Sequence, residues 1–279
     1  MSNPRPELGA TLDHLCVQSS DPDRLASFYE AAYGLARTPI AGGWQCAAPG
    51  RTLLVSAGRS NSVACFAYRF ESPPALRALR ESLRAKGQEP AANASPLFDD
   101  DAFSLTDPDG NVVAFGVRDV APFAVDAPFP ARLQHCAFRT TQIDALVTFY
   151  AALGFVISDR VEDDAGVLRA CFLRSDHEHH ALALFGSPET RLDHISCETR
   201  DIGALTAWAD RLSALHIPIH WGIGRHGPGN DIFFMVKDPD DNLIEISADL
   251  EVCAPERPTG RWRHEPRTLN LWGTAIMRS

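Results

Sequence analysis

Apolar and polar positions in the first third of the chain follow two different periods. An apolar run at residues 12–18 precedes Ser20 and Asp21, and apolar residues then recur at helical spacing as far as Gly34. This pattern predicts a strand followed by a helix over residues 22–32, with Ser20 or Asp21 at its N-cap. Later patterns predict strands near 44–56, 62–70 and 103–117, and a helix near 74–86.

The same order of patterns returns in the second half. Residues 133–154 repeat the strand, helix and closing glycine of residues 12–34, so that His14 matches His135. Residues 65–87 parallel 193–216, and 103–117 parallel 233–247, each of the last two with a DPD turn between strands. The sequence therefore predicts an internal duplication and an α+β fold, with two tandem domains that each contain two βαβββ modules.

The prolines and alanines of residues 119–131 (DVAPFAVDAPFPA) predict a linker. We expect an N-terminal domain over residues 1–120 and a C-terminal domain over 131–250. Residues 251–279 lack clear periodicity, yet Trp262, Leu271 and Trp272 are too apolar for a free tail. We expect this tail to pack on the second domain.

Residues 232–247 (IFFMVKDPDDNLIEIS) predict a β-hairpin, because two strand-forming runs flank a Pro/Asp/Asn cluster. Its second strand places Glu245 between two isoleucines. A carboxylate in such a strand is costly unless it is paired or bound to a cation. Glu245 therefore needs a partner.

Aligning the two halves supplies candidate partners. By this alignment the first half carries His14, Phe66 and Ala114 where the second carries His135, His194 and Glu245. Two histidines and one carboxylate occupy one face of an octahedral Fe(II) or Mn(II) and leave the other positions open. The pattern predicts a metal centre in the second half, whereas His14 is expected to be an ordinary core or surface histidine.

Several short segments together carry a family resemblance: LQHCAFRT with His135, DHEHHALAL with His179 and His180, LDHISCET with His194, GRHGPGN with His226, and DPDDNLIEI with Glu245. The chain resembles the vicinal oxygen chelate (glyoxalase/bleomycin resistance/dioxygenase) superfamily. Within it, the chain looks like a two-domain type I extradiol catechol dioxygenase. The resemblance implies the vicinal oxygen chelate fold, with a metal site in the C-terminal domain alone.

The resemblance also implies roles for particular residues. His135, His194 and Glu245 would bind the metal. His180, on the strand preceding His194, would be the acid/base residue, and His226 would hydrogen-bond the substrate; His179 is expected to face outward. Met235 stands where the family commonly has a tyrosine that contacts a substrate oxygen. Phe185 and Trp221 are candidates for an apolar wall around the substrate, or equally for core residues.

The function implied by the resemblance is ring cleavage of a catechol-type aromatic with Fe(II), or with Mn(II), and O2. This would be an oxidoreductase of aromatic degradation. One alternative is another metal-dependent enzyme of the superfamily, an isomerase, lyase or thiol transferase that does not use O2, and Met235 keeps this alternative open. A ligand-sequestering binding protein is a second alternative, against which the intact set of three ligands argues.

Composition narrows the partners and the compartment. The formal net charge is −10 and no basic cluster is dense enough to follow a phosphate backbone, so nucleic acid is not an expected partner. There is no signal-peptide pattern or membrane span, and the seven cysteines are scattered singly without a CxxC pair. We expect a soluble, cytoplasmic protein, and the exposed strands of such sheets and the family habit predict a homo-oligomer.

Overall fold

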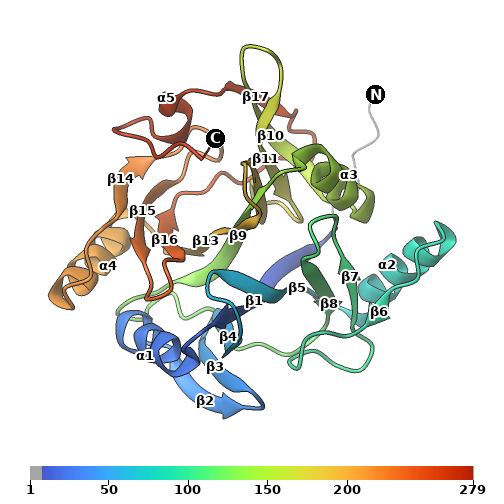
Figure 1. Ribbon diagram of the computed structural model, residues 1–279, viewed down its shortest axis with the longest axis horizontal. Helices are drawn as coiled ribbons and strands as arrows, with labels where there is room; N and C mark the ends of the chain where they lie inside the picture. Colours follow the sequence, from blue (N-terminus) through green and yellow to red (C-terminus); the bar gives the residue numbers. More distant parts are fainter. Residues whose placement is uncertain (1–7, 279) are drawn as a thin grey trace.

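The computed structural model describes residues 8–278 and contains two curved sheets with helices on their outer sides (Figure 1). The first half consists of two modules in succession. They comprise β1 (Ala10–Ser19), α1 (Pro22–Tyr33), β2 (Ala36–Ile40), β3 (Gly43–Ala48) and β4 (Arg51–Ala57), then β5 (Ser62–Phe70), α2 (Pro73–Ala85), β6 (Ala91–Ala92), β7 (Phe103–Thr106) and β8 (Val112–Gly116).

The second half repeats this order. Its modules comprise β9 (Arg132–Thr140), α3 (Ile143–Leu153), β10 (Val156–Glu162), β11 (Leu168–Arg174) and β12 (Leu182–Gly186), then β13 (Arg191–Glu198), α4 (Ile202–Ala214), β14 (Trp221–Arg225), β15 (Ile232–Lys237) and β16 (Leu243–Ala248). The predicted α+β fold of four βαβββ modules is confirmed. The predicted hairpin is β15 and β16, which pair antiparallel.

The two modules of each half join into one sheet through their first strands. The first sheet has the order β2-β3-β4-β1-β5-β8-β7-β6. The second has the order β14-β15-β16-β13-β9-β12-β11-β10-β17, where β17 (Gly260–Arg263) comes from the C-terminal segment. Both central pairs, β1 with β5 and β9 with β13, are antiparallel. Residues 117–131, which connect the sheets, contain neither helix nor strand. Whether each half forms a separate domain with the proposed limits stays a prediction.

The two halves share one hydrophobic core. Side chains of both sheets and of helices α1 and α3 belong to a single buried cluster. Within it the ring centroids of Phe66 and Phe138 are 5.0 Å apart. The hydroxyl of Tyr68 donates to the carbonyl of Ala181 at 3.1 Å. The first half is thus part of the support for the second sheet.

A reciprocal pair of hydrogen bonds also joins the halves. Tyr29 on α1 donates to Asp238 in the DPD turn of the second half, with an oxygen–oxygen distance of 2.7 Å. Tyr150 on α3 donates to Asp107 in the DPD turn of the first half at 2.8 Å. Tyr29 and Tyr150 occupy equivalent positions of the repeat, and each donates to the DPD turn of the opposite half.

The pairing registers correct one position of the repeat alignment. In the second sheet Ala137 lies opposite His194, and in the first sheet the equivalent residue Cys16 lies opposite Cys65. Cys65, and not Phe66, is therefore the counterpart of His194. The alignment was wrong by one residue, which in a strand moves a side chain to the other face of the sheet. Ala114 is confirmed as the counterpart of Glu245.

The C-terminal segment lies against the second sheet. Strand β17 (Gly260–Arg263) pairs in parallel with β10, and α5 (Pro266–Leu269) follows it. The Trp262 indole donates to Asp159 on β10 at 2.7 Å. Trp272 differs from its expected burial: it is exposed, with the Arg225 guanidinium over its ring. None of the described helices is long and apolar enough to span a membrane.

The reciprocal tyrosines give a first stability prediction. We expect Tyr29→Phe and Tyr150→Phe each to lower the free energy of unfolding by about 1 to 3 kcal/mol, because each leaves a buried carboxylate short of one donor. Urea denaturation measures this. Tyr33→Phe is the matched control, since the Tyr33 hydroxyl is buried without a hydrogen-bond partner among the described residues. A Tyr33 variant as unstable as the other two would contradict the argument.

Asp238 gives a pH prediction. Burial raises the pKa of Asp238 to about 6, although hydrogen bonds from Asn242 and Tyr29 oppose this. The pKa of an unfolded aspartate is about 3.9, so the folded state binds this proton more tightly. The stability from this proton is present below about pH 4 and is lost as the pH rises through about 6. We expect Asp238→Asn to flatten the pH dependence of the free energy of unfolding in this range, and equal slopes in urea titrations would refute this.

Candidate metal centre

Two β-bulges shape the inner face of the second sheet. The register between β9 and β13 shifts at Gln134 and at Asp193, the residues that directly precede His135 and His194. A bulge re-aims side chains, so that neighbouring residues no longer point to opposite faces. Asp193 Oδ1 accepts a hydrogen bond from His194 Nδ1 at 2.6 Å, and Gln134 Oε1 accepts one from His135 Nδ1. Each bulge thus orients the histidine that follows it.

These hydrogen bonds determine which ring nitrogens carry protons. The Gln134 amide nitrogen donates to the carbonyl of His180 at 2.7 Å, so its oxygen faces His135. Because both partners are acceptors, the protons are on Nδ1 of His135 and His194, and both Nε2 atoms present lone pairs. These two Nε2 atoms are only 3.0 Å apart. Two converging lone pairs repel each other unless a cation lies between them.

Glu245 completes the set from β16. Its Oε1 lies 3.6 Å from His135 Nε2 and accepts a hydrogen bond from Ser196 at 2.7 Å. Ligand atoms that lie about 2.1 Å from one ion at right angles are about 3.0 Å apart. The three ligand atoms lie within 4.8 Å of one another, and their residues are buried. The geometry therefore fits one divalent ion of the Fe(II) or Mn(II) type.

Electrostatics keep these groups in the states that bind a metal. Burial lowers the pKa of His135 to about 3, so the ring is neutral at neutral pH. Burial by itself raises the pKa of Glu245, but the hydrogen bond from His226 and electrostatic interactions with the neighbouring histidines outweigh it and lower the pKa below its usual range. The carboxylate is thus ionised. Neutral imidazoles and a carboxylate are the protonation states that metal binding requires.

His180 lies beside this set, and its neighbour His179 corrects an expectation. The His180 ring is 4.3 Å from the His135 ring, centroid to centroid, and burial lowers its pKa well below the ordinary value. His179 was expected to face outward but is fully buried. Its Nδ1 lies 3.0 Å from His180 Nδ1, and its Nε2 lies 3.2 Å from Asp159. The alternation of a strand does not apply, because β12 begins only at Leu182.

His226 approaches Glu245 from the loop after β14. Its Nδ1 donates to the carbonyl of Leu269 at 2.6 Å, and its Nε2 is 3.4 Å from Glu245 Oε2. The ring stacks on Phe233 at 3.7 Å. Burial lowers the pKa of His226, but the charges of Asp231 and Glu245 outweigh burial and raise it. Asp231 is fully buried, and neither carboxylate oxygen has a hydrogen-bond partner among the described residues.

The two candidate ligand histidines open onto a small apolar pocket. Besides His135 and His194, its walls include His180, His226, Phe172, Phe185, Leu269 and Arg278. Its volume is about 20 Å³. The pocket therefore brings both proposed catalytic histidines and one of the three proposed substrate residues to the candidate metal site.

The other two proposed substrate residues lie beside the pocket wall. Met235 is fully buried and pairs with Glu245 across β15 and β16, which puts it on the inner face. Its sulfur is 4.0 Å from the Arg278 guanidinium. Trp221 lies 5.7 Å from the His226 ring, and its indole donates to the carbonyl of Thr274 at 2.8 Å. Both side chains contact the C-terminal segment or the neighbouring histidine.

Sequence reasoning missed several polar residues of the site: Gln134, Asp193, Ser196, Asp231 and Arg278. A signal for the first two was available, since a hydrogen-bonding residue directly precedes each histidine in QH and DH. The pair Asp13 and His14 repeats this arrangement at 2.6 Å in the first half. Arg278 had no such signal, because only the folded chain brings it to β13.

The corresponding place in the first half is filled. The His14 ring bonds Ser95 through Nε2 at 2.7 Å, and Phe98 packs edge-on against it at 5.1 Å. Cys65 and Ala114 replace the other two ligands. The expectation that His14 is an ordinary core histidine is confirmed, since it is fully buried and hydrogen-bonded through both ring nitrogens.

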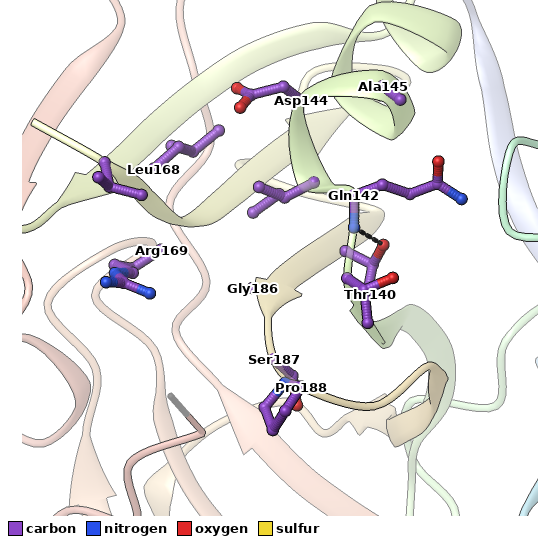
Figure 2. A pocket seen from close by; sticks show the side chains of 12 residues that line it. Thr140, Gln142, Asp144, Ala145, Leu168, Arg169, Gly186, Ser187 and Pro188 are labelled. Carbon is purple, nitrogen blue, oxygen red and sulfur yellow. Dashed lines mark hydrogen bonds between the residues drawn. The ribbon is translucent and has the colours of Figure 1, made fainter.

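A second, larger hollow lies elsewhere. It has a volume of about 600 Å³ and is lined by the start of α3 and by residues of β11 and the end of β12. Figure 2 shows Thr140 and Gln142 on one side, and Arg169 and Pro188 around the remainder. None of the site histidines lines it. The small pocket is the better candidate, because its apolar walls adjoin the converging Nε2 atoms of His135 and His194, which are absent from the lining of the larger hollow.

Comparison with known proteins found similarity to one family. Residues 132–246, which contain the three candidate ligand residues, match the model for the Glyoxalase/Bleomycin resistance protein/Dioxygenase superfamily. Metapyrocatechase 2 of Cupriavidus necator is 27% identical over 220 residues, which is 68% of each chain. Biphenyl-2,3-diol 1,2-dioxygenase 3 of Rhodococcus globerulus is 26% identical over 159 residues, covering 52% of this chain and 77% of that protein.

Solved structures show the same fold. Homoprotocatechuate 2,3-dioxygenase from Brevibacterium fuscum has a TM-score of 0.83 at 21% identity, over 98% of this chain and 92% of that one. An Mn(II)-bound glyoxalase from Novosphingobium aromaticivorans has a TM-score of 0.79 at 24% identity, over 98% and 93%. The fold is thus shared by oxygenases and by enzymes of other activity, so fold alone does not assign the reaction.

The site geometry predicts metal binding. We expect Fe(II)-reconstituted wild-type protein to hold about one metal ion per chain, and His194→Ala to lose it because one of three ligands is gone. Elemental analysis measures this, and the thermal stabilisation by added metal gives a second readout. His14→Ala is the matched control in the other half and should retain the ion. Wild-type protein that stays essentially metal-free after reconstitution would contradict the assignment.

Proposed function

We propose that this chain, whose residues 132–246 match the model for the Glyoxalase/Bleomycin resistance protein/Dioxygenase superfamily, is an extradiol ring-cleaving dioxygenase. Its substrate is a catechol-type aromatic with vicinal hydroxyl groups, and its co-substrate is O2. The observation that carries the proposal is the convergence of two unprotonated Nε2 atoms and one carboxylate beside two further histidines in an apolar pocket. The similarity to biphenyl-2,3-diol 1,2-dioxygenase 3 supports the proposal at modest identity, and the fold is shared with homoprotocatechuate 2,3-dioxygenase.

His135, His194 and Glu245 would hold the cofactor, which we propose to be Fe(II), with Mn(II) as the alternative. An ion bound by three protein ligands on one face supplies open positions at which both diol oxygens and O2 can bind and exchange electrons. The chain must then orient the ring, exclude water and move protons. The remaining residues of the pocket divide these tasks.

His180 is proposed as the acid/base residue. The Asp159 carboxylate near His179 Nε2 favours a proton on that nitrogen, so that His179 Nδ1 accepts from His180 Nδ1. His180 Nε2 is then left free to take and return a proton inside the pocket. Its neutrality at neutral pH, which follows from burial, suits the acceptance of a diol proton.

His226 and the aromatic residues are proposed to position the substrate. Because His226 Nδ1 donates to Leu269, its Nε2 faces Glu245 and the pocket, where it can donate to a substrate oxygen. The raised pKa of His226 favours the protonated, donating form. Phe172 and Phe185 form apolar walls that exclude water. Met235 supplies no hydroxyl donor, so any donor on that side comes from another residue.

A second candidate function is a metal-dependent reaction without O2, such as that of an isomerase, lyase or thiol transferase. The fold likeness to an Mn(II)-bound glyoxalase favours this alternative. The proposed oxygenase differs from it in needing O2 and in the histidines beside the three ligands. A ligand-sequestering protein would have no use for converging ligand atoms. We further propose a cytoplasmic homo-oligomer that serves aromatic degradation.

Oxygen consumption tests the proposal. We expect Fe(II)-loaded wild-type protein to consume O2 with at least one member of a panel of catechols and to form a yellow semialdehyde product. Oxygen electrode traces and product absorbance measure this. Loaded protein that binds iron but consumes no O2 with any vicinal diol would transfer the assignment to the reaction without O2.

His180→Asn should lower kcat by about 10²- to 10⁴-fold, the usual contribution of a general acid or base, with the metal content unchanged. His177→Asn is the matched control, because His177 lies on the same connection but is exposed. Steady-state oxygen uptake and elemental analysis together separate proton transfer from metal loss. A His180 variant as active as the His177 variant would exclude the acid/base role.

A further inference from the structure

Arg278 is a buried cation in the candidate active site whose role the proposed function does not explain. It is 7% exposed and comes from the C-terminal segment into the pocket beside His135 and His194. Its guanidinium carbon lies over the Phe185 ring at 5.1 Å and over the Trp221 ring at 4.7 Å. A planar group therefore contacts two aromatic faces at the wall of the pocket.

The Arg278 guanidinium occupies space beside the candidate metal ligands that an aromatic substrate would need. The pocket that remains has a volume of about 20 Å³, whereas a cavity that binds benzene has about 150 Å³. Most other walls are strand residues or are hydrogen-bonded in place. A guanidinium and an aromatic ring are both flat and both stack on aromatic faces. The slot between Phe185 and Trp221 suits either group.

Asp193 holds Arg278 in this position. Arg278 Nη2 lies 3.1 Å from Asp193 Oδ1, and its Nε lies 3.3 Å from both carboxylate oxygens. Asp193 also accepts hydrogen bonds from His194 and, at 2.7 Å, from Arg139. If Arg278 leaves, the Asp193 carboxylate keeps these two partners. Displacement of Arg278 therefore does not leave the buried Asp193 carboxylate without hydrogen-bond donors.

We propose that Arg278 is a placeholder for the aromatic substrate: its guanidinium fills the slot of Phe185 and Trp221, and the substrate ring enters by displacing it. This inference rests on the proposed function, since it assumes a ring that binds beside the metal ligands. Its consequence is that the apparent affinity for the substrate is the intrinsic affinity multiplied by the fraction of molecules in which the slot is open.

The test uses holoprotein loaded with Fe(II) and kept free of O2, with unsubstituted catechol as the probe. Free catechol is uncharged near neutral pH, so loss of a cation does not change its electrostatic attraction to the site before it binds. Binding is followed by stopped-flow tryptophan fluorescence, because Trp221 lies in the slot. We expect Arg278→Ala to associate with catechol about 10-fold faster than wild type and to bind it more tightly, with the metal content retained.

Arg139→Ala is the matched control. It removes the other arginine of Asp193 but leaves the slot filled, because Arg139 does not line the pocket. A change of metal content that occurs in both variants is attributed to the loss of an arginine partner of Asp193. Faster association with catechol is expected for Arg278→Ala alone. A chain that ends at Thr274 serves as a second variant without Arg278, and it keeps the Trp221 partner. It should also associate faster than wild type.

The outcomes separate the inference from the proposed function. Faster association in both variants that lack Arg278, and not in Arg139→Ala, supports the placeholder. Catechol binding with equal or slower association in those variants overturns the placeholder and leaves the proposed function intact. Iron-loaded wild type and variants that all fail to bind catechol overturn the proposed function and the placeholder together.

Discussion

The hydrogen bond between each ligand histidine and the residue before it is the constraint on which the site depends. Gln134 and Asp193 occupy bulges, accept from Nδ1 of the following ring, and so leave both Nε2 lone pairs directed at one point. Without these acceptors either ring could carry its proton on Nε2 and lose the ability to bind a cation. Glu245 then adds the charge that makes the point attractive to a divalent ion.

Duplication explains why only one half has this site. Both halves keep the bulge and the hydrogen bond to the first histidine, but in the first half Ser95 and Phe98 cover His14, and Ala114 offers no ligand atom at the position of Glu245. Its contribution is structural, through the shared core and the two reciprocal tyrosine hydrogen bonds. The half that lacks the three candidate ligands thus stabilises the sheet that carries them.

The C-terminal segment contributes residues to the wall of the pocket. Trp262 bonds Asp159, which lies against His179; Leu269 holds the His226 ring; and Arg278 bonds Asp193. The segment therefore contacts His226 directly and contacts the carboxylates that lie beside His179 and His194. Leu269 and Arg278 of this segment line the pocket, whereas the bonds from Asp193 to His194 and Arg139 do not involve it.

The sequence by itself determined the four modules and the hairpin, because strand and helix periods are local. It also proposed His135, His194 and Glu245 as candidate metal ligands, because the repeat made positions of the two halves comparable. Tertiary structure decided the rest. Strand register assigned Cys65 as the counterpart of His194, since a bulge is a property of two paired strands. Burial of His179 followed from a bend that alternation does not describe. Arg278 reached Asp193 only through the path of the folded chain, which no local pattern encodes.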